Sequence, residues 1–231
     1  MKTIGLLGGM SWESTQGYYR SINEGIKSRL GGLHSAQISM YSVDFDPIEK
    51  LQHQGDWAGT AAILSQAAKN IQAAGADFLL ICTNTMHKVA PQIEAAIDIP
   101  LLHIADATAK ELIKQNIKKV GLLGTAFTME QGFYKDRLTD KFGLSVVVPN
   151  EADRAVVHEV IYQELCLGKI NPNSKSEYLR IIRTLADQGA KAVILGCTEI
   201  GMLVKQSDTD VLLIDTTEIH AQAAVDFALT L

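Results

Sequence analysis

Positive charge is scarce in this sequence. Its 21 lysines and arginines are outnumbered by 26 aspartates and glutamates, which gives a formal net charge of −5 at pH 7. Proteins that bind nucleic acid or anionic membranes present clustered basic residues. Apolar runs also stay short of the roughly 18 residues that a membrane helix needs, and the apolar N-terminus is broken at Gly8-Gly9 without a cleavage site. We therefore expect a soluble, unprocessed chain without nucleic-acid or membrane partners.

Cysteine is equally scarce. Cys82, Cys166 and Cys197 are an odd number and have no C-x-x-C spacing, so a disulfide framework is not expected. The six histidines have no metal-ligand spacing. Only His87, which lies near Thr83, is a candidate for a functional role. These absences predict a reduced, cytoplasmic protein that holds no metal.

A nucleotide-binding signature is missing as well. The apolar stretch 3–7 ends in Gly8-Gly9, and a helix is predicted to begin near Ser11. This pattern is neither G-x-G-x-x-G nor a P-loop. A glycine turn before a helix can still expose backbone N–H groups to a small anionic ligand.

What the sequence does contain is an internal repeat. Residues 75–85 and 189–199 both begin with Gly-Ala, continue with an apolar run suited to a buried parallel strand, and end in small polar residues. Aligned without a gap, they place Cys197 opposite Thr83. Three more pairs match in the same order, namely 4–8 with 120–124, 16–20 with 131–135, and 101–102 with 212–213. We infer a tandem duplication of one α/β unit.

The alternation of strands and helices within each copy predicts the fold. Strands are expected at 3–7, 36–44, 78–82, 101–104 and 120–124, each followed by a helical pattern. Such spacing is typical of a parallel sheet covered by helices. We expect two pseudo-symmetric Rossmann-like α/β domains with the active site in the cleft between them. The first covers 1–100 and is completed by 210–231, and the second covers 101–209.

Helix ends are marked by familiar signals. Gly75 and Gly189 are predicted to end helices in the left-handed conformation. Capping-box spacing occurs in the pair Thr128 and Gln131 and in the pair Ser174 and Glu177, the latter before a helix predicted over 177–188.

Thr83 and Cys197 follow equivalent strands, where ligands collect in parallel sheets. Inverting a stereocentre needs one group to remove a proton from one face and another to return a proton to the opposite face. A thiol suits this task if helix N-terminal N–H groups lower its pKa, and Cys197 precedes a predicted helix. We predict that Cys197, as thiolate, removes an α-proton while Thr83, or a water it holds, delivers one.

Three motifs resemble the cofactor-independent aspartate/glutamate racemase family, and within it the L-aspartate/glutamate-specific and broad-specificity amino-acid racemases. They are Gly-Leu-Leu-Gly-Gly-Met-Ser-Trp-Glu-Ser-Thr at 5–15, Cys-Thr-Asn-Thr-Met-His at 82–87 and Gly-Cys-Thr-Glu at 196–199. The resemblance covers essentially the whole chain. It implies two-base racemisation of aspartate, glutamate or a wider set of amino acids without pyridoxal phosphate, and commonly a homodimer.

The resemblance also implies residues that line the site. Gln52 and Cys166 are paired at the duplication shift and stand where members specific for acidic substrates are expected to carry basic residues. A neutral pair offers no charge for a side-chain carboxylate, which favours broader specificity. The other implied substrate-binding residues are Met10, Asn84, Thr85, Thr125, Thr198 and Glu199.

Position 83 departs from the family pattern, because most members have a cysteine there. In this chain the cysteine is one residue earlier, and neighbouring strand residues point to opposite faces, so Cys82 is predicted to be buried and structural.

Two alternatives to a racemase remain open. One is a decarboxylase or cis–trans isomerase on the same scaffold that uses one cysteine, and the other is an amino-acid-binding protein without catalysis.

Overall fold

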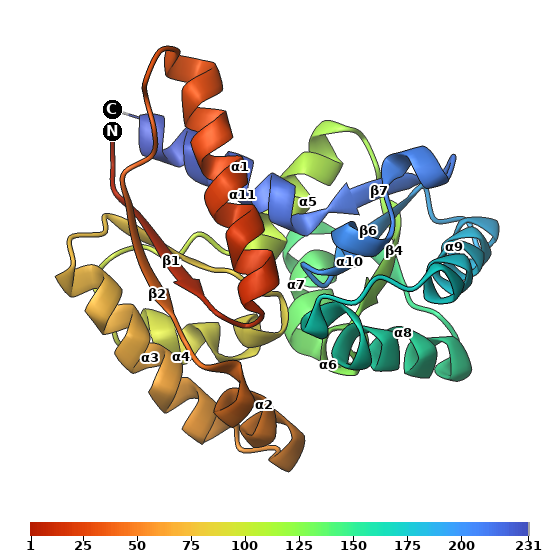
Figure 1. Ribbon diagram of the computed structural model, residues 1–231. Coiled ribbons are helices and arrows are strands. Elements are labelled where there is room, and N and C mark those ends of the chain that lie inside the picture. Colours follow the sequence, from red (N-terminus) through yellow and green to blue (C-terminus); the bar gives the residue numbers. More distant parts are fainter. Residues whose placement is uncertain (231) are drawn as a thin grey trace. The chain divides into compact units, whose positions relative to one another are not determined.

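The computed structural model describes residues 1–230, which form two compact units (Figure 1). The first unit contains residues 1–104 and the C-terminal segment from His220, and the second contains Ala105–Ile219. The chain therefore leaves the first unit after Ile104 and returns to it at His220. Each unit is built around its own parallel sheet.

The first unit has a three-stranded sheet in the order β2-β1-β3, made by β1 (Ile4–Gly8), β2 (Ile38–Ser42) and β3 (Phe78–Ile81). Apolar residues fill both faces of the central strand. Leu7 packs with α3 (Trp57–Ala73) and α4 (Ala90–Glu94), whereas Leu6 packs with α1 (Trp12–Leu30) and α11 (Thr216–Leu229). The unit also contains α2 (Phe45–Gln54) and the 3-10 turn η1 (Thr85–Val89).

The second unit has a four-stranded sheet in the order β5-β4-β6-β7. Its strands are β4 (Lys119–Gly124), β5 (Ser145–Val147), β6 (Ala192–Gly196) and β7 (Leu212–Asp215). The order β5-β4-β6 repeats the order β2-β1-β3, as a duplicated unit would. Its helices are α5 (Ile104–Lys114), α6 (Ala126–Glu130), α7 (Gly132–Phe142), α8 (Glu151–Gln163), η2 (Leu165–Leu167), α9 (Pro172–Asp187), α10 (Ile200–Leu203) and η3 (Gln206–Asp208).

The division between the units differs from the predicted boundaries. Residues 210–219 were expected to complete the first domain, but β7 pairs with β6 in the second sheet, with Ile194 opposite Ile214. The strand predicted at 101–104 is reduced to a single bridge between Leu79 and Leu101. The chain turns into α5 at Ile104, directly after this bridge.

Several predicted helix ends agree with the structure. Ser11 caps α1 by accepting the backbone N–H of Ser14 at 3.5 Å. Gly75 and Gly189 follow α3 and α9 with φ of +88° and +94°, a conformation that side chains with a Cβ rarely adopt. These glycines allow each helix to stop and the chain to enter the next strand.

Both predicted capping boxes are wrong. The helix α9 begins at Pro172, because Asn171 accepts the N–H of Asn173 and Pro172 needs no partner at the first helical position. Ser174 and Glu177 therefore lie inside the helix. In the second case Thr125 is the cap of α6, and it accepts the N–H of Thr128 at 3.3 Å.

Candidate active site

Cys197 is the first residue after β6, a strand whose five residues are all buried. The register pairs Gly124 with Gly196, so Thr125 and Cys197 both leave the sheet at the same edge. The two strands are close here, since a Cβ on Gly196 would lie 2.7 Å from the carbonyl oxygen of Leu123. Glycine at position 196 therefore allows β6 to lie close to β4 immediately before Cys197.

The side chain of Cys197 is held by a carboxylate. Its Sγ donates to Oε2 of Glu199 at 2.8 Å, and the hydroxyl of Thr198 donates to the same oxygen at 3.0 Å. All three residues are buried, and Glu199 is only 2% exposed. Oε2 of Glu199 is therefore the direct hydrogen-bond acceptor of both the Cys197 thiol and the Thr198 hydroxyl.

The expected lowering of the Cys197 pKa is wrong. Burial, the negative charge of Glu199 and the nearby Cys166 raise the pKa of the Cys197 thiol well above its ordinary range, and the backbone N–H of Glu199 offsets only part of this effect. The following helix, α10, has four residues and contributes little as a dipole. The resting form of Cys197 is therefore the thiol.

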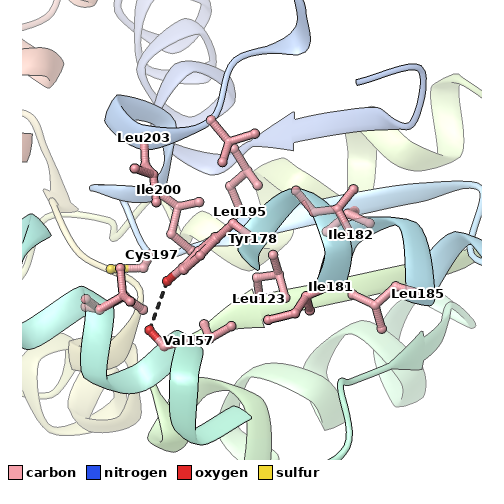
Figure 2. Packing of buried hydrophobic residues seen from close by; sticks show 14 of the residues in the cluster. Leu123, Val157, Tyr178, Ile181, Ile182, Leu185, Leu195, Cys197, Ile200 and Leu203 are labelled. Carbon is pink, nitrogen blue, oxygen red and sulfur yellow. Dashed lines mark hydrogen bonds between the residues drawn. The ribbon is translucent and has the colours of Figure 1, made fainter. Parts of the chain in front are cut away.

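Apolar packing fixes the position of Cys197. It belongs to the apolar cluster that contains Leu123 and Leu195, and Figure 2 shows it near Ile200 and the ring of Tyr178. The hydroxyl of Tyr178 donates to the carbonyl of Val157 at 2.9 Å. Burial, followed by the charges around Cys197, raises the pKa of Tyr178 well above its usual value, so this phenol stays protonated and serves packing.

Cys166 is half-buried in η2 and packs against the same apolar cluster. The second unit thus brings together Cys166, Cys197, Thr198 and Glu199, while Thr125 lies at the adjacent strand end. Within the described residues, none of the three cysteines forms a disulfide.

In the first unit Thr83 follows β3, and the register of Leu7 with Ile81 brings the Gly9-Met10 turn to the same sheet edge as Thr83 and Asn84. Thr83, Asn84 and Thr85 are all buried. Cys82 is fully buried against Leu6 and Leu80, and burial raises its pKa far above the ordinary value. The prediction that Cys82 is buried is confirmed.

Two more predicted residues lie beside this segment. Gln52, at the end of α2, is buried and contacts Sδ of Met86 through its amide nitrogen at 3.5 Å. Met10 packs in the apolar cluster that also contains Met86. The first unit therefore gathers Met10, Gln52, Thr83, Asn84 and Thr85 around one strand end.

His87, the one histidine that the sequence marked as a functional candidate, contacts the main chain of Thr83. Its Nδ1 lies 2.8 Å from the carbonyl oxygen of Thr83. The four-residue separation of the two within a short turn is the signal that could have identified the contact.

Within residues 1–230, no three His, Cys, Asp or Glu side chains are grouped as metal ligands. Over the same part of the chain, no helix has the length and apolarity to cross a membrane.

Comparisons with known proteins identify a family match and several relatives that cover nearly the whole chain. The Asp/Glu/hydantoin racemase family matches residues 7–224. The broad specificity amino-acid racemase RacX of Bacillus subtilis (strain 168) is 25% identical over 238 residues, 96% of each chain. A solved structure from Yersinia pestis, provisionally assigned as an Asp/Glu racemase, is 56% identical with a TM-score of 0.92 and covers 100% of both chains. An aspartate racemase homologue from Pyrococcus horikoshii OT3 is 34% identical with a TM-score of 0.85, again over 100% of both chains.

The chain belongs to the Asp/Glu/hydantoin racemase family, which confirms the resemblance noted in its motifs. It is an isomerase of the amino-acid racemase class. The two parallel-sheet units agree with the fold predicted from the repeat.

Proposed function

We propose that this racemase interconverts the L- and D-forms of aspartate, glutamate or a wider set of amino acids without pyridoxal phosphate or a metal. The observation that carries the proposal is the buried pair of Cys197 and Glu199. Cys197 directly follows a strand, and its thiol is hydrogen-bonded to the Glu199 carboxylate at 2.8 Å. The names of the relatives, a broad specificity racemase and an aspartate racemase homologue, support this substrate range.

In the proposed reaction, Cys197 and Thr83 are the catalytic pair. Glu199 takes the thiol proton, the sulfur electron pair then removes the α-proton, and the C–H electron pair stays on Cα and the adjoining carboxylate. Thr83, or a water it holds, delivers a proton to the opposite face. The proton on Glu199 returns through solvent to the Thr83 side, so the cycle closes without a net change in the enzyme.

The two catalytic groups differ in acidity, since a hydroxyl is a much weaker acid than a thiol. This asymmetry can change kcat and KM separately for the two directions. It cannot change their ratio, because free enantiomers have equal free energy and any true racemase has equal kcat/KM for both. A one-way reaction is therefore excluded.

Substrate binding is assigned to the polar and apolar residues that surround the two strand ends. Gln52 and Cys166 are neutral, which supports a site that accepts side chains beyond carboxylates. The remaining binding residues proposed here are Met10, Asn84, Thr85, Thr125 and Thr198.

The decisive experiment follows the α-proton of L-aspartate, L-glutamate and several neutral amino acids by NMR in D2O. Wild type should exchange the α-proton and form the D-enantiomer. Cys197→Ser should abolish both, while Thr83→Ala should retain exchange without inversion. Loss of CO2 would favour the decarboxylase, and calorimetric binding without any exchange would favour the binding protein.

We also propose that the protein is a homodimer and that the first unit carries the interface. The strand β2 contains no charged residue, and three large side chains on it or beside it are exposed, Trp12 at 63%, Tyr19 at 53% and Met40 at 49%. They line a hollow of about 300 Å³ with Thr15, Gln16 and Ser42. An uncharged edge suits the same patch of a second copy, because a two-fold interface pairs a surface with itself.

Light scattering during gel filtration tests this assignment. Wild type should have the mass of two chains, and Met40→Lys should shift it to one chain, because the substitution places a charge in the apolar interface. A matched substitution on the edge strand of the second unit, Ser145→Lys, should leave the dimer intact. A monomeric wild type would refute the proposal.

We propose a cytoplasmic setting for the protein. None of the three cysteines forms a disulfide in the described residues, which supports this proposal.

A further inference from the structure

Three buried histidines gather in the first unit behind Thr83. His87 comes from η1, His103 precedes α5 and His220 lies in α11. The ring centroid of His87 lies 4.4 Å from that of His103 and 6.1 Å from that of His220. Three imidazoles at this spacing in a dry interior can coexist only if they are not all charged.

Both ring nitrogens of His87 face backbone groups. Nε2 accepts the N–H of Ile104 at 3.2 Å, and Nδ1 lies 2.8 Å from the carbonyl oxygen of Thr83. A backbone amide can only donate, so Nε2 carries no proton. A carbonyl can only accept, so Nδ1 carries the single proton. The geometry defines a neutral ring in one tautomer.

His220 braces the same region from a different helix. Its Nε2 donates to the carbonyl of Leu102 at 2.7 Å, which leaves Nδ1 to accept the hydroxyl of Tyr18 at 2.9 Å. Burial lowers the pKa of His220 to about 4, so it is neutral at physiological pH. The segment 102–104 is thereby held on both sides by imidazoles, at the place where the chain leaves the first unit.

We propose that His87 is a positioning residue for the racemase reaction. It fixes the main chain of Thr83 against segment 102–104, and through the main chain it fixes the direction of the Thr83 hydroxyl. The inference rests on the proposed function, because it takes Thr83 as the group that serves the second face. A displacement of about 1 Å at a reacting group can lower a rate roughly 100-fold.

Two substitutions separate the two bonds of His87. In His87→Asn the amide nitrogen replaces Nδ1 and keeps the bond to Thr83. In His87→Gln the amide oxygen replaces Nε2, so the bond to Ile104 is kept and the bond to Thr83 is lost. The exposed His34→Asn substitution is the control and should behave as wild type.

We expect His87→Gln to lower inversion by about 100-fold in kcat, with KM changed little and α-proton exchange on the Cys197 face retained. His87→Asn should recover most of the inversion. Equal losses in both variants, or full inversion in His87→Gln, would overturn the positioning role. Absence of inversion in wild type would instead refute the proposed function. Wild type is therefore assayed before the variants are compared.

A second measurement does not depend on the folding of variants. Nitrogen NMR of 15N-histidine-labelled wild type should show His87 as a neutral Nδ1–H tautomer. An Nε2–H tautomer, or a charged ring at pH 7, would contradict the bond to Thr83 and with it the proposal.

Discussion

Thr83 and Cys197 occupy equivalent places in the two units, within two residues of the ends of β3 and β6, yet they are held in different ways. Thr83 is fixed through its backbone, since His87 bonds its carbonyl oxygen. Cys197 is fixed through its side chain, since its thiol donates a hydrogen bond to Glu199. The repeated strands set where each residue stands, while non-repeated neighbours set what it can do. A duplicated scaffold can therefore place two chemically different side chains at equivalent positions.

The largest effect on kcat is expected from a substitution of Glu199, the residue that distinguishes the surroundings of Cys197 from those of Thr83. Glu199→Gln keeps an oxygen near the thiol but removes the proton acceptor, so kcat should fall by about 10²- to 10⁴-fold with KM little changed. Removing the negative charge also lowers the pKa of Cys197, so alkylation by iodoacetamide at pH 7 should become faster. Steady-state kinetics and alkylation rates measure the two effects.

Thr198→Val is the control for Glu199→Gln, because it removes only the second donor to the same carboxylate oxygen. Its kcat should fall less than tenfold. A kcat for Glu199→Gln equal to that of wild type would show that the thiol loses its proton elsewhere. A rise in KM with unchanged kcat would mean that Glu199 binds substrate only.

The next largest effect is a difference between the two units in how their stability responds to acid pH. His220 has a pKa of about 4 in the folded first unit, against roughly 6.5 when unfolded, so its contribution to stability is complete above pH 6.5 and declines as the pH falls towards 4. The loss is on the order of 2 kcal/mol at pH 5. In the second unit Arg180 lowers the pKa of Asp153, whose contribution persists until the pH falls below about 4.

Hydrogen exchange of strand amides at pH 7 and pH 5 measures this difference. Protection of β3 should fall at pH 5 while that of β6 changes little. His220→Gln, which retains a donor for Leu102, should reduce the pH dependence of β3. Equal losses of protection in both strands would contradict the prediction.

The smallest effect compares two buried tyrosines. Tyr178→Phe removes a donor to the carbonyl of Val157, and Tyr18→Phe removes a donor to His220. Each should cost about 1 kcal/mol of unfolding free energy, measured by urea denaturation. Tyr178→Phe should keep kcat within a factor of about two, because the phenol only packs beside Cys197 and a buried side chain of the same shape replaces it. A large loss of kcat would assign Tyr178 a chemical role.

Much of this architecture could be predicted from the sequence. Apolar runs ending in small polar residues located β3 and β6, and the gapless repeat aligned Thr83 with Cys197. The start of α9 was missed because two cap signals compete, and Pro172 decides in favour of Asn171. The placement of β7 was missed because the pairing partner of residues 212–215 is not encoded in their own pattern.

The electrostatic state of the site was less predictable. A thiol before a helix suggested a lowered pKa, but burial, followed by the negative charge of Glu199, raises the pKa of Cys197, and α10 has only four residues to oppose this. The histidine group was hidden for another reason. His87 joins Thr83 to Ile104 and His220 joins Leu102 to Tyr18, and such distant partners meet only after the sheet has formed.

The surroundings of Cys197 also affect how readily its sulfur is oxidised. Peroxide and disulfide reagents attack the thiolate far faster than the thiol. Burial in the apolar cluster, together with the negative charge of Glu199, keeps the sulfur protonated and so shields it from conversion to sulfenic and sulfinic acids. The packing that fixes the position of Cys197 thus also protects its thiol against oxidative damage.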